Sequence, residues 1–228
     1  MSFQGQTIVV IGASGVLGSR IATELASLGA NVIGTASSES SAGRIPDQVT
    51  SKKVVDLADS NSITNFANDV VDSHSSLDGV IVAAGVVGFG LIEETDPALA
   101  SKMMEINFSG PAKLISKLYP ALKNHTNEKA FVVGITGVVV EQTFPGMSIY
   151  SASKSALSNY LQSIEKEWRR YKIKTLEVRL GHTETGLATR PLFGAAPAMP
   201  TGHAPEHAVS VIVNAINSET KILASSDF

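Results

Sequence analysis

The sequence predicts an α/β fold in which helices cover both faces of a doubly wound parallel sheet. Short runs rich in valine and isoleucine alternate along the chain with segments whose apolar residues recur every three or four positions. A glycine-rich loop separates the first of these runs from the first helical segment. The length of 228 residues, without a linker or a repeat, fits one domain that spans residues 1–228.

Composition narrows the classes of protein to consider. The net charge of −3 and the lack of a basic run argue against a nucleic-acid partner. The chain has no cysteine, which excludes disulfides and thiolate metal sites, and we expect no metal. Its longest apolar stretches, residues 77–92 and 130–140, are interrupted or too short to span a bilayer. The N-terminus shows no signal-peptide pattern, so we expect a soluble, cytoplasmic protein without a membrane partner.

Strands and helices are expected in alternation. The expected strands are residues 7–11, 30–35, a short third strand ending at 55, 77–82, 131–135, 173–179 and an edge strand at 221–224. Helices are expected after the glycine loop, around residues 60–71, and over 96–121, 149–171 and 205–216. Residues 39–51 are predicted to form a surface connection, and the proline-containing segment 186–204 a lid over a substrate site. In such sheets, ligands bind at the carboxyl ends of the strands.

The glycine loop predicts a dinucleotide site. Gly12, Gly15 and Gly18 lie between a strand and a helix, where glycines let the backbone approach a pyrophosphate and the helix N-terminus supplies N–H groups. In NAD-preferring sites an acidic residue ends the second strand, but Ala36 and Ser37 stand there instead. A serine can hydrogen-bond a 2′-phosphate, and no carboxylate repels that group. The sequence therefore favours NADP over NAD, although the nearest cation is only Arg44.

Tyr150 and Lys154 form the candidate acid/base pair. Their i, i+4 spacing places both side chains on one face of the predicted helix, one turn apart. A tyrosine has an ordinary pKa of about 10, and a lysine beside it favours the phenolate, which lowers that pKa. Such pairs also occur by chance on solvated helix faces. Asn107 leaves two interpretations open as well, because a mid-helix asparagine indicates either a kink or close packing, or a side chain that holds a catalytic water.

Six motifs stand in the same order as in the short-chain dehydrogenase/reductase family, which the chain resembles over nearly its whole length. They are the glycine loop 12–18, Asp56-Leu57, Ala83-Ala84-Gly85, Asn107-x-x-Gly110, Tyr150-x-x-x-Lys154 and the loop 181–185. The resemblance implies a Rossmann-like fold and an oxidoreductase that transfers a hydride between NAD(P) and a small carbonyl or alcohol substrate. It also implies a homodimer or a homotetramer.

The resemblance further implies a role for each matching residue. Tyr150 would exchange a proton with the substrate oxygen, and Lys154 would bind the nicotinamide ribose and lower the pKa of Tyr150. Asn107 would hold a water that links Lys154 to solvent. The implied cofactor contacts are Gly12, Ser14, Val16 and Gly18 at the adenosine and pyrophosphate, Ser37 at the 2′ position, Asp56 and Leu57 at the adenine, Ala83 and Gly85 at the ribose, and Gly181, Thr183 and Thr185 at the nicotinamide end.

The chain departs from the family pattern at three places. Its glycine loop has the spacing G-x-x-G-x-x-G instead of G-x-x-x-G-x-G, and Leu180 stands where a proline is usual. The family also places a serine about thirteen residues before the tyrosine, and this position is Gly137 here. Thr136 is the predicted substitute, because its hydroxyl is adjacent in sequence. Ser148 is a weaker candidate for this role. His182 and Glu184 are candidates to line the pocket, although contacts with the lid or with solvent are the favoured interpretation for both.

Two alternatives to an active oxidoreductase remain at this point. The missing serine favours a cofactor-binding sensor or partner module with weak or no turnover, whereas the intact Asn-Tyr-Lys set favours an enzyme. The glycine spacing also suggests a relative of sugar-nucleotide epimerases, but the chain is short for the additional substrate domain of those proteins. A hydrophobic substrate is favoured by the apolar lid residues Leu187, Leu192, Phe193 and Met199.

Overall fold

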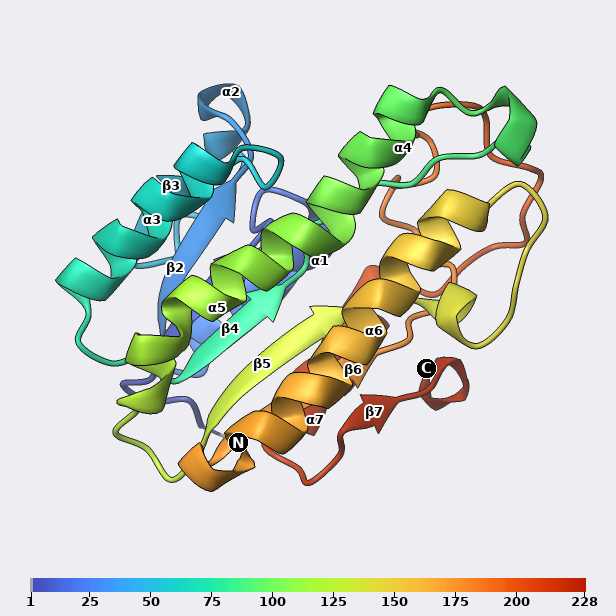
Figure 1. Cartoon of the computed structure of the whole chain (residues 1–228). Helices are drawn as coiled ribbons and strands as arrows, with labels where there is room; N and C mark the ends of the chain where they lie inside the picture. Colours follow the sequence, from blue (N-terminus) through green and yellow to red (C-terminus); the bar gives the residue numbers. More distant parts are fainter. Residues whose placement is uncertain (1) are drawn as a thin grey trace.

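The computed structural model describes residues 2–228, which form a parallel sheet covered by helices on both faces (Figure 1). The sheet contains seven strands in the order β3-β2-β1-β4-β5-β6-β7. The strands are β1 Thr7–Ile11, β2 Asn31–Ala36, β3 Ser51–Val54, β4 Gly79–Val82, β5 Ala130–Ile135, β6 Ile173–Val178 and β7 Ile222–Leu223. Every pairing between neighbouring strands is parallel. The predicted fold class is confirmed.

The helices divide between the two faces of the sheet. Helices α1 (Val16–Ser27) and α7 (Pro205–Ile216) pack on one face, and α3 (Ser60–Ser73), α5 (Gly110–Lys123) and α6 (Ser148–Trp168) pack on the other (Figure 1). Strand β1 shows how the sequence builds both layers, since successive side chains of a strand point to opposite faces. Ile8 and Val10 belong to one apolar cluster, and Val9 and Ile11 to the other. This burial on both faces explains the nearly continuous apolar runs of the strands.

The long helix expected over residues 96–121 is interrupted at its centre. Helix α4 (Pro97–Met104) leads into a π-helical turn at Glu105–Ser109, which continues directly into α5. Asn107 lies within this turn, and π-helical turns of this kind occur frequently at functional sites. A side chain at Gly110 would overlap the Leu57 carbonyl oxygen, so close packing against the loop after β3 requires glycine there.

Smaller differences from the predicted elements have local causes. The expected surface connection over 39–51 contains a short helix, α2 (Glu39–Ala42), because the Ser38 and Ser41 side chains cap its first turn. Strand β4 begins two residues later than expected, and the Asp78 carboxylate just before it accepts the Thr7 backbone N–H and the Asn127 amide. Within residues 2–228, no helix is long and apolar enough to cross a membrane.

Candidate active site

The glycine loop lies at the carboxyl end of β1, against the exit of β4. Gly12 has a φ of +86°, and a Cβ there would lie only 2.7 Å from the Ala84 backbone nitrogen. A Cβ at Gly18 would overlap the Gly12 carbonyl oxygen. The Gly12 N–H donates to the Thr35 hydroxyl at 3.1 Å, which ties the loop to β2. The loop therefore presents backbone without side chains at the N-terminus of α1. A pyrophosphate can bind to the N–H groups of such a helix terminus.

The region predicted to face the adenosine is formed by the ends of β2 and β3. Ala36 pairs with Val54 in the register of the sheet, so the residues that follow both strands emerge side by side. Ser37 and Asp56 are exposed there, and Leu57 is buried. One Asp56 oxygen accepts the Ala58 N–H at 2.9 Å, which fixes the direction of the carboxylate. The structure therefore brings Ser37 and Asp56 to one edge of the sheet.

Asn107 connects the exit of β4 to helix α6. Its Oδ1 accepts the Val86 N–H at 2.9 Å, and its Nδ2 donates to the Val86 carbonyl at 2.9 Å and to the Ser153 Oγ at 3.0 Å. The Ser153 hydroxyl donates in turn to the Tyr150 carbonyl at 2.7 Å. Both amide hydrogens of Asn107 are therefore used within the protein. Sequence reasoning missed Ser153, although its position three residues after Tyr150 places it beside that residue on the helix.

Lys154 is buried with 5% of its surface exposed, and its Nζ donates to the Ile135 carbonyl at 2.8 Å. This contact joins α6 to the end of β5. Ala83 and Gly85 follow β4 beside it, and a Cβ at Gly85 would lie 3.2 Å from both Lys154 Nζ and Asn107 Oδ1. Burial lowers the pKa of Lys154 to about 8, because the charged ammonium loses its hydration.

Tyr150 stands beside Lys154, with the ammonium nitrogen 5.9 Å from the centre of the phenol ring. Burial raises the pKa of Tyr150 to about 12. The expectation that Lys154 lowers this pKa is therefore wrong for the protein by itself, because burial disfavours the charged phenolate. A phenol with a raised pKa holds its proton at neutral pH, but it is a weaker acid than an ordinary tyrosine, because a catalytic acid works best with a pKa near the working pH.

Gly137 lies where the family serine would stand. A Cβ at this glycine would lie 3.9 Å from the Tyr150 hydroxyl and 3.5 Å from the Leu180 carbonyl oxygen. Gly137 therefore faces the Tyr150 hydroxyl, but it has no side chain that could donate a hydrogen bond to a substrate. Its φ of +108° favours glycine, so a serine placed here would strain the backbone.

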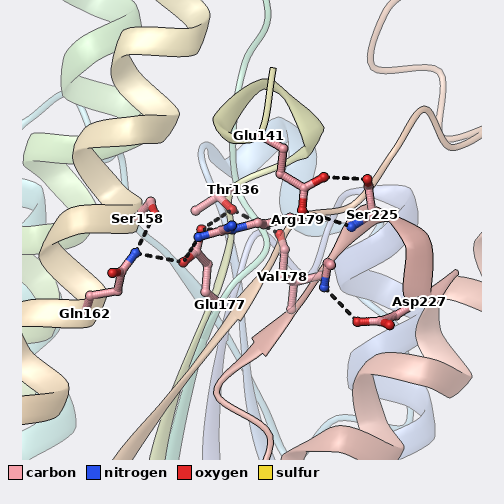
Figure 2. A network of polar contacts seen from close by, with 10 residues as sticks. Thr136, Glu141, Ser158, Gln162, Glu177, Val178, Arg179, Ser225 and Asp227 are labelled. Carbon is pink, nitrogen blue, oxygen red and sulfur yellow. Dashed lines mark hydrogen bonds and ion pairs between the residues drawn. The ribbon is translucent and has the colours of Figure 1, made fainter. Parts of the chain in front are cut away.

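The Thr136 side chain does not point to the space between Gly137 and Tyr150. It points into the polar network in Figure 2. Its hydroxyl lies 3.1 Å from a Glu177 carboxylate oxygen and 3.2 Å from the Val178 carbonyl. Arg179 pairs with the same carboxylate at 2.9 Å, and the Gln162 amide lies 3.3 Å from its other oxygen. Thr136 lies directly after β5, and its side chain is turned to Glu177 and Val178 of β6. This geometry does not support the predicted role of Thr136 as a substrate donor.

The Thr136→Val variant tests this reassignment. We expect turnover to stay within about twofold of wild type, while the free energy of unfolding falls by about 1–3 kcal/mol because the buried Glu177 carboxylate loses a donor. Urea denaturation and a turnover assay measure the two effects. Thr64→Val, which removes an exposed hydroxyl on α3, is the matched control and should change stability by no more than about 0.5 kcal/mol. A tenfold loss of turnover at unchanged stability would return Thr136 to the substrate site.

The loop after β6 is held by the far end of the lid. Thr183 forms a parallel bridge with His203, and the Thr183 hydroxyl donates to the Gly181 carbonyl at 3.0 Å. Glu184 accepts the Gly202 N–H at 2.7 Å and lies 3.4 Å from the His182 ring nitrogen. His182 and Glu184 therefore contact each other and the lid. Thr185 accepts the Leu187 N–H at 3.4 Å, at the start of the lid.

The lid itself is bonded to the segment that follows β4. Within residues 186–204 there is no helix or strand, apart from the bridge at His203. Leu192 N–H donates to the Val87 carbonyl at 2.7 Å, and Phe89 N–H donates to the Phe193 carbonyl at 3.0 Å. Gly194 is needed beside this pairing, because a Cβ there would overlap the Phe89 carbonyl oxygen. The segment predicted to form a lid is therefore bonded to residues 87–89, after the exit of β4.

Comparisons with known proteins identify the family of the chain. The family model described as short chain dehydrogenase matches residues 6–191. An uncharacterized oxidoreductase of Staphylococcus saprophyticus is 24% identical over 202 residues, which cover 86% of each chain. Dehydrogenase/reductase SDR family member 7B of Bos taurus is 28% identical over 193 residues, which cover 79% of this chain but only 59% of that protein. A short chain dehydrogenase of Burkholderia cenocepacia, solved in complex with NADP, superposes with a TM-score of 0.84 at 20% identity and covers 98% of this chain and 89% of its own.

Proposed function

Because the chain belongs to the short-chain dehydrogenase family, we propose that it is an oxidoreductase that uses NADP or NAD to interconvert a small carbonyl and its alcohol. The observation that carries the proposal is the arrangement of Tyr150, Gly137 and Lys154 at the end of β5. The Tyr150 hydroxyl lies beside the bare backbone of Gly137, and Lys154 joins the same helix to the end of β5. A carbonyl oxygen placed in the space at Gly137 is within reach of the Tyr150 proton.

The residues around this point suit a nicotinamide dinucleotide. Gly12, Gly18 and Gly85 have no side chains that would block a bound cofactor. They lie at the glycine loop, in the first turn of α1 and beside Lys154. Ser37 and Asp56 would hold the adenosine end, and Thr183 and Thr185 the nicotinamide end. The cofactor supplies the hydride when it is bound.

The protein's own part of the reaction is to hold and move a proton. The Tyr150 hydroxyl, which is protonated at neutral pH, donates it to the substrate oxygen in the direction of reduction. The Lys154 ammonium, placed one helical turn away, would bind the ribose and replace the lost proton. Asn107 fixes the distance between these residues and the β4 exit through its contacts with Val86 and Ser153.

The experiment that tests this function is a turnover assay with a panel of carbonyl compounds, run beside a titration with each cofactor. Cofactor binding with steady oxidation of NADPH or NADH supports the oxidoreductase. Cofactor binding without turnover of any carbonyl instead supports the alternative, a sensor or partner module. The specific observation in favour of that alternative is Gly137, which leaves the substrate oxygen without the second donor that stabilises developing charge.

The cofactor preference provides a separate prediction. Ala36 is buried, so the exposed Ser37 is the better position for a new carboxylate. We expect wild-type protein to bind NADPH more tightly than NADH, and Ser37→Asp to raise the dissociation constant for NADPH by about tenfold through repulsion of the 2′-phosphate. Binding is measured by cofactor fluorescence, and NADH is the internal control because it lacks that phosphate. Equal weakening of both cofactors would show that Ser37 does not face the 2′ position.

A further inference from the structure

Exposed large apolar side chains gather at the active-site end of the molecule. Among residues 2–228, five such side chains are exposed: Leu91 at 50%, Ile92 at 59%, Phe144 at 37%, Met199 at 38% and Ile222 at 38%. The first four lie on three loops, namely the segment after β4, the loop before α6 and the lid. Figure 1 shows these loops together beyond the ends of β4, β5 and β6, whereas Ile222 lies on the edge strand β7.

Backbone hydrogen bonds hold the three loops together next to Tyr150. Gly90 N–H donates to the Gly146 carbonyl at 2.9 Å, four residues before Tyr150 in the sequence. The pairing of Leu192 and Phe193 with the segment 87–89 joins the lid to the same place. Leu91 and Ile92 follow this junction directly, and Phe144 precedes it by two residues. We call the side chains of Leu91, Ile92 and Phe144 the apolar rim.

The apolar character continues inward from the rim. The Phe193 ring packs over Gly88, where a Cβ would lie 2.5 Å from the ring. The Met103 methyl group lies 2.8 Å from the same position. Phe89 and Val87 in this segment are also buried. The wall between the rim and the exit of β4 is therefore made of apolar side chains and glycine backbone.

The charges beside the rim are negative. Glu93, Glu94 and Asp96 follow Ile92 within four positions, and all three are exposed. The lid contributes Arg190, whose guanidinium is turned to the Gly186 and Thr185 carbonyls of its own loop. A cluster of carboxylates at an entrance repels anions and leaves uncharged molecules unaffected.

We propose that the substrate is an uncharged carbonyl compound whose apolar body lies across the rim while its carbonyl reaches Tyr150. This inference rests on the proposed oxidoreductase function and names the substrate class of the same site. Contact with exposed apolar side chains removes part of each methylene of the substrate from water. Affinity for the substrate should therefore grow with the length of its apolar chain.

A homologous series of methyl ketones, from about four to about ten carbons, tests the inference together with keto carboxylates of matched length. We expect KM to fall about twofold for each added methylene, and each keto carboxylate to have a KM at least about tenfold above its neutral counterpart. Ile92→Ser and Phe144→Ser should each raise KM for the longest ketone by about threefold or more and leave the shortest ketone unchanged. Ile222→Ser, a change of the same kind on β7, is the control and should alter neither.

Calorimetric binding of the same ketones to the protein loaded with cofactor separates this inference from the proposed function. Chain-length-dependent binding without turnover would support the apolar rim and defeat the oxidoreductase. Turnover without dependence on chain length, or with a preference for keto carboxylates, would keep the oxidoreductase and overturn the inference. Sedimentation of Ile92→Ser and Phe144→Ser measures the oligomeric state. A change in this state at unchanged KM would show that the rim is an interface between copies of the chain, and this result would also overturn the inference.

Discussion

Replacing Tyr150 by phenylalanine should lower turnover by at least about a hundredfold and leave cofactor affinity within about twofold of wild type. The hydroxyl is the group placed beside Gly137, and general acid catalysis by a positioned side chain contributes about 10²–10⁴-fold. The Ser153 contact uses the Tyr150 backbone carbonyl, so Asn107, Ser153 and the helix keep their contacts in the variant. Cofactor binding by fluorescence and steady-state turnover measure the two quantities.

Tyr160→Phe is the matched control for this prediction. Tyr160 lies on the same helix, its hydroxyl donates to the Ala112 carbonyl at 3.1 Å, and burial raises its pKa to about 12 as well. It faces α5 instead of the end of β5, so its loss should cost stability without a comparable loss of turnover. Near-normal turnover in Tyr150→Phe would show that another group transfers the proton.

Lys154→Met should change the dependence of stability on pH. The pKa of Lys154 is about 8 in the folded protein and 10.5 as its ordinary value. Between these values the unfolded chain binds a proton that the folded protein does not, so the wild type gains stability as pH rises. The free energy of unfolding of wild type should therefore rise by about 3 kcal/mol relative to Lys154→Met between about pH 7 and pH 10.5.

Urea denaturation of both proteins across this range, without cofactor, measures the difference, because groups common to both cancel. Lys166→Met, which removes an exposed lysine from the same helix, is the control for the substitution itself. A difference between wild type and Lys154→Met that is flat across the range would show that Lys154 stays charged in its buried position. The variant should also lose turnover and cofactor affinity, since the ammonium serves both.

Much of the fold follows from local pattern. The runs at Thr7–Ile11 and Ala130–Ile135 are apolar at nearly every position, which is typical of parallel strands that are buried on both faces. The segments whose apolar residues recur every three or four positions became α1, α3, α6 and α7, because this spacing places the apolar residues on one face of a helix. The π-helical turn around Asn107 was not predictable, because it depends on the contacts of that side chain with Val86 and Ser153, which lie far away in the sequence.

The positions of site residues that follow from their spacing in the sequence were predictable. The properties that depend on residues packed around them in the fold were not. Counting residues from Tyr150 identified Gly137, and the structure places that glycine beside the phenol. Thr136 was chosen for its hydroxyl alone, and the buried Glu177 that accepts it belongs to another strand. The pKa of Tyr150 was expected to fall because its lysine neighbour is visible in the sequence. Its burial is visible only in the folded chain, and burial determines the direction.

Hydride transfer itself is the most direct test of the central claim. NADPH that carries deuterium at its transferable position is incubated with the protein and a neutral methyl ketone, and the alcohol product is analysed by mass spectrometry. The expected result is deuterium at the former carbonyl carbon with wild-type protein and at least about a hundredfold less product with Tyr150→Phe. Tight cofactor binding without deuterated alcohol from any ketone, aldehyde or keto acid would contradict the claim and identify the chain as a cofactor-binding module.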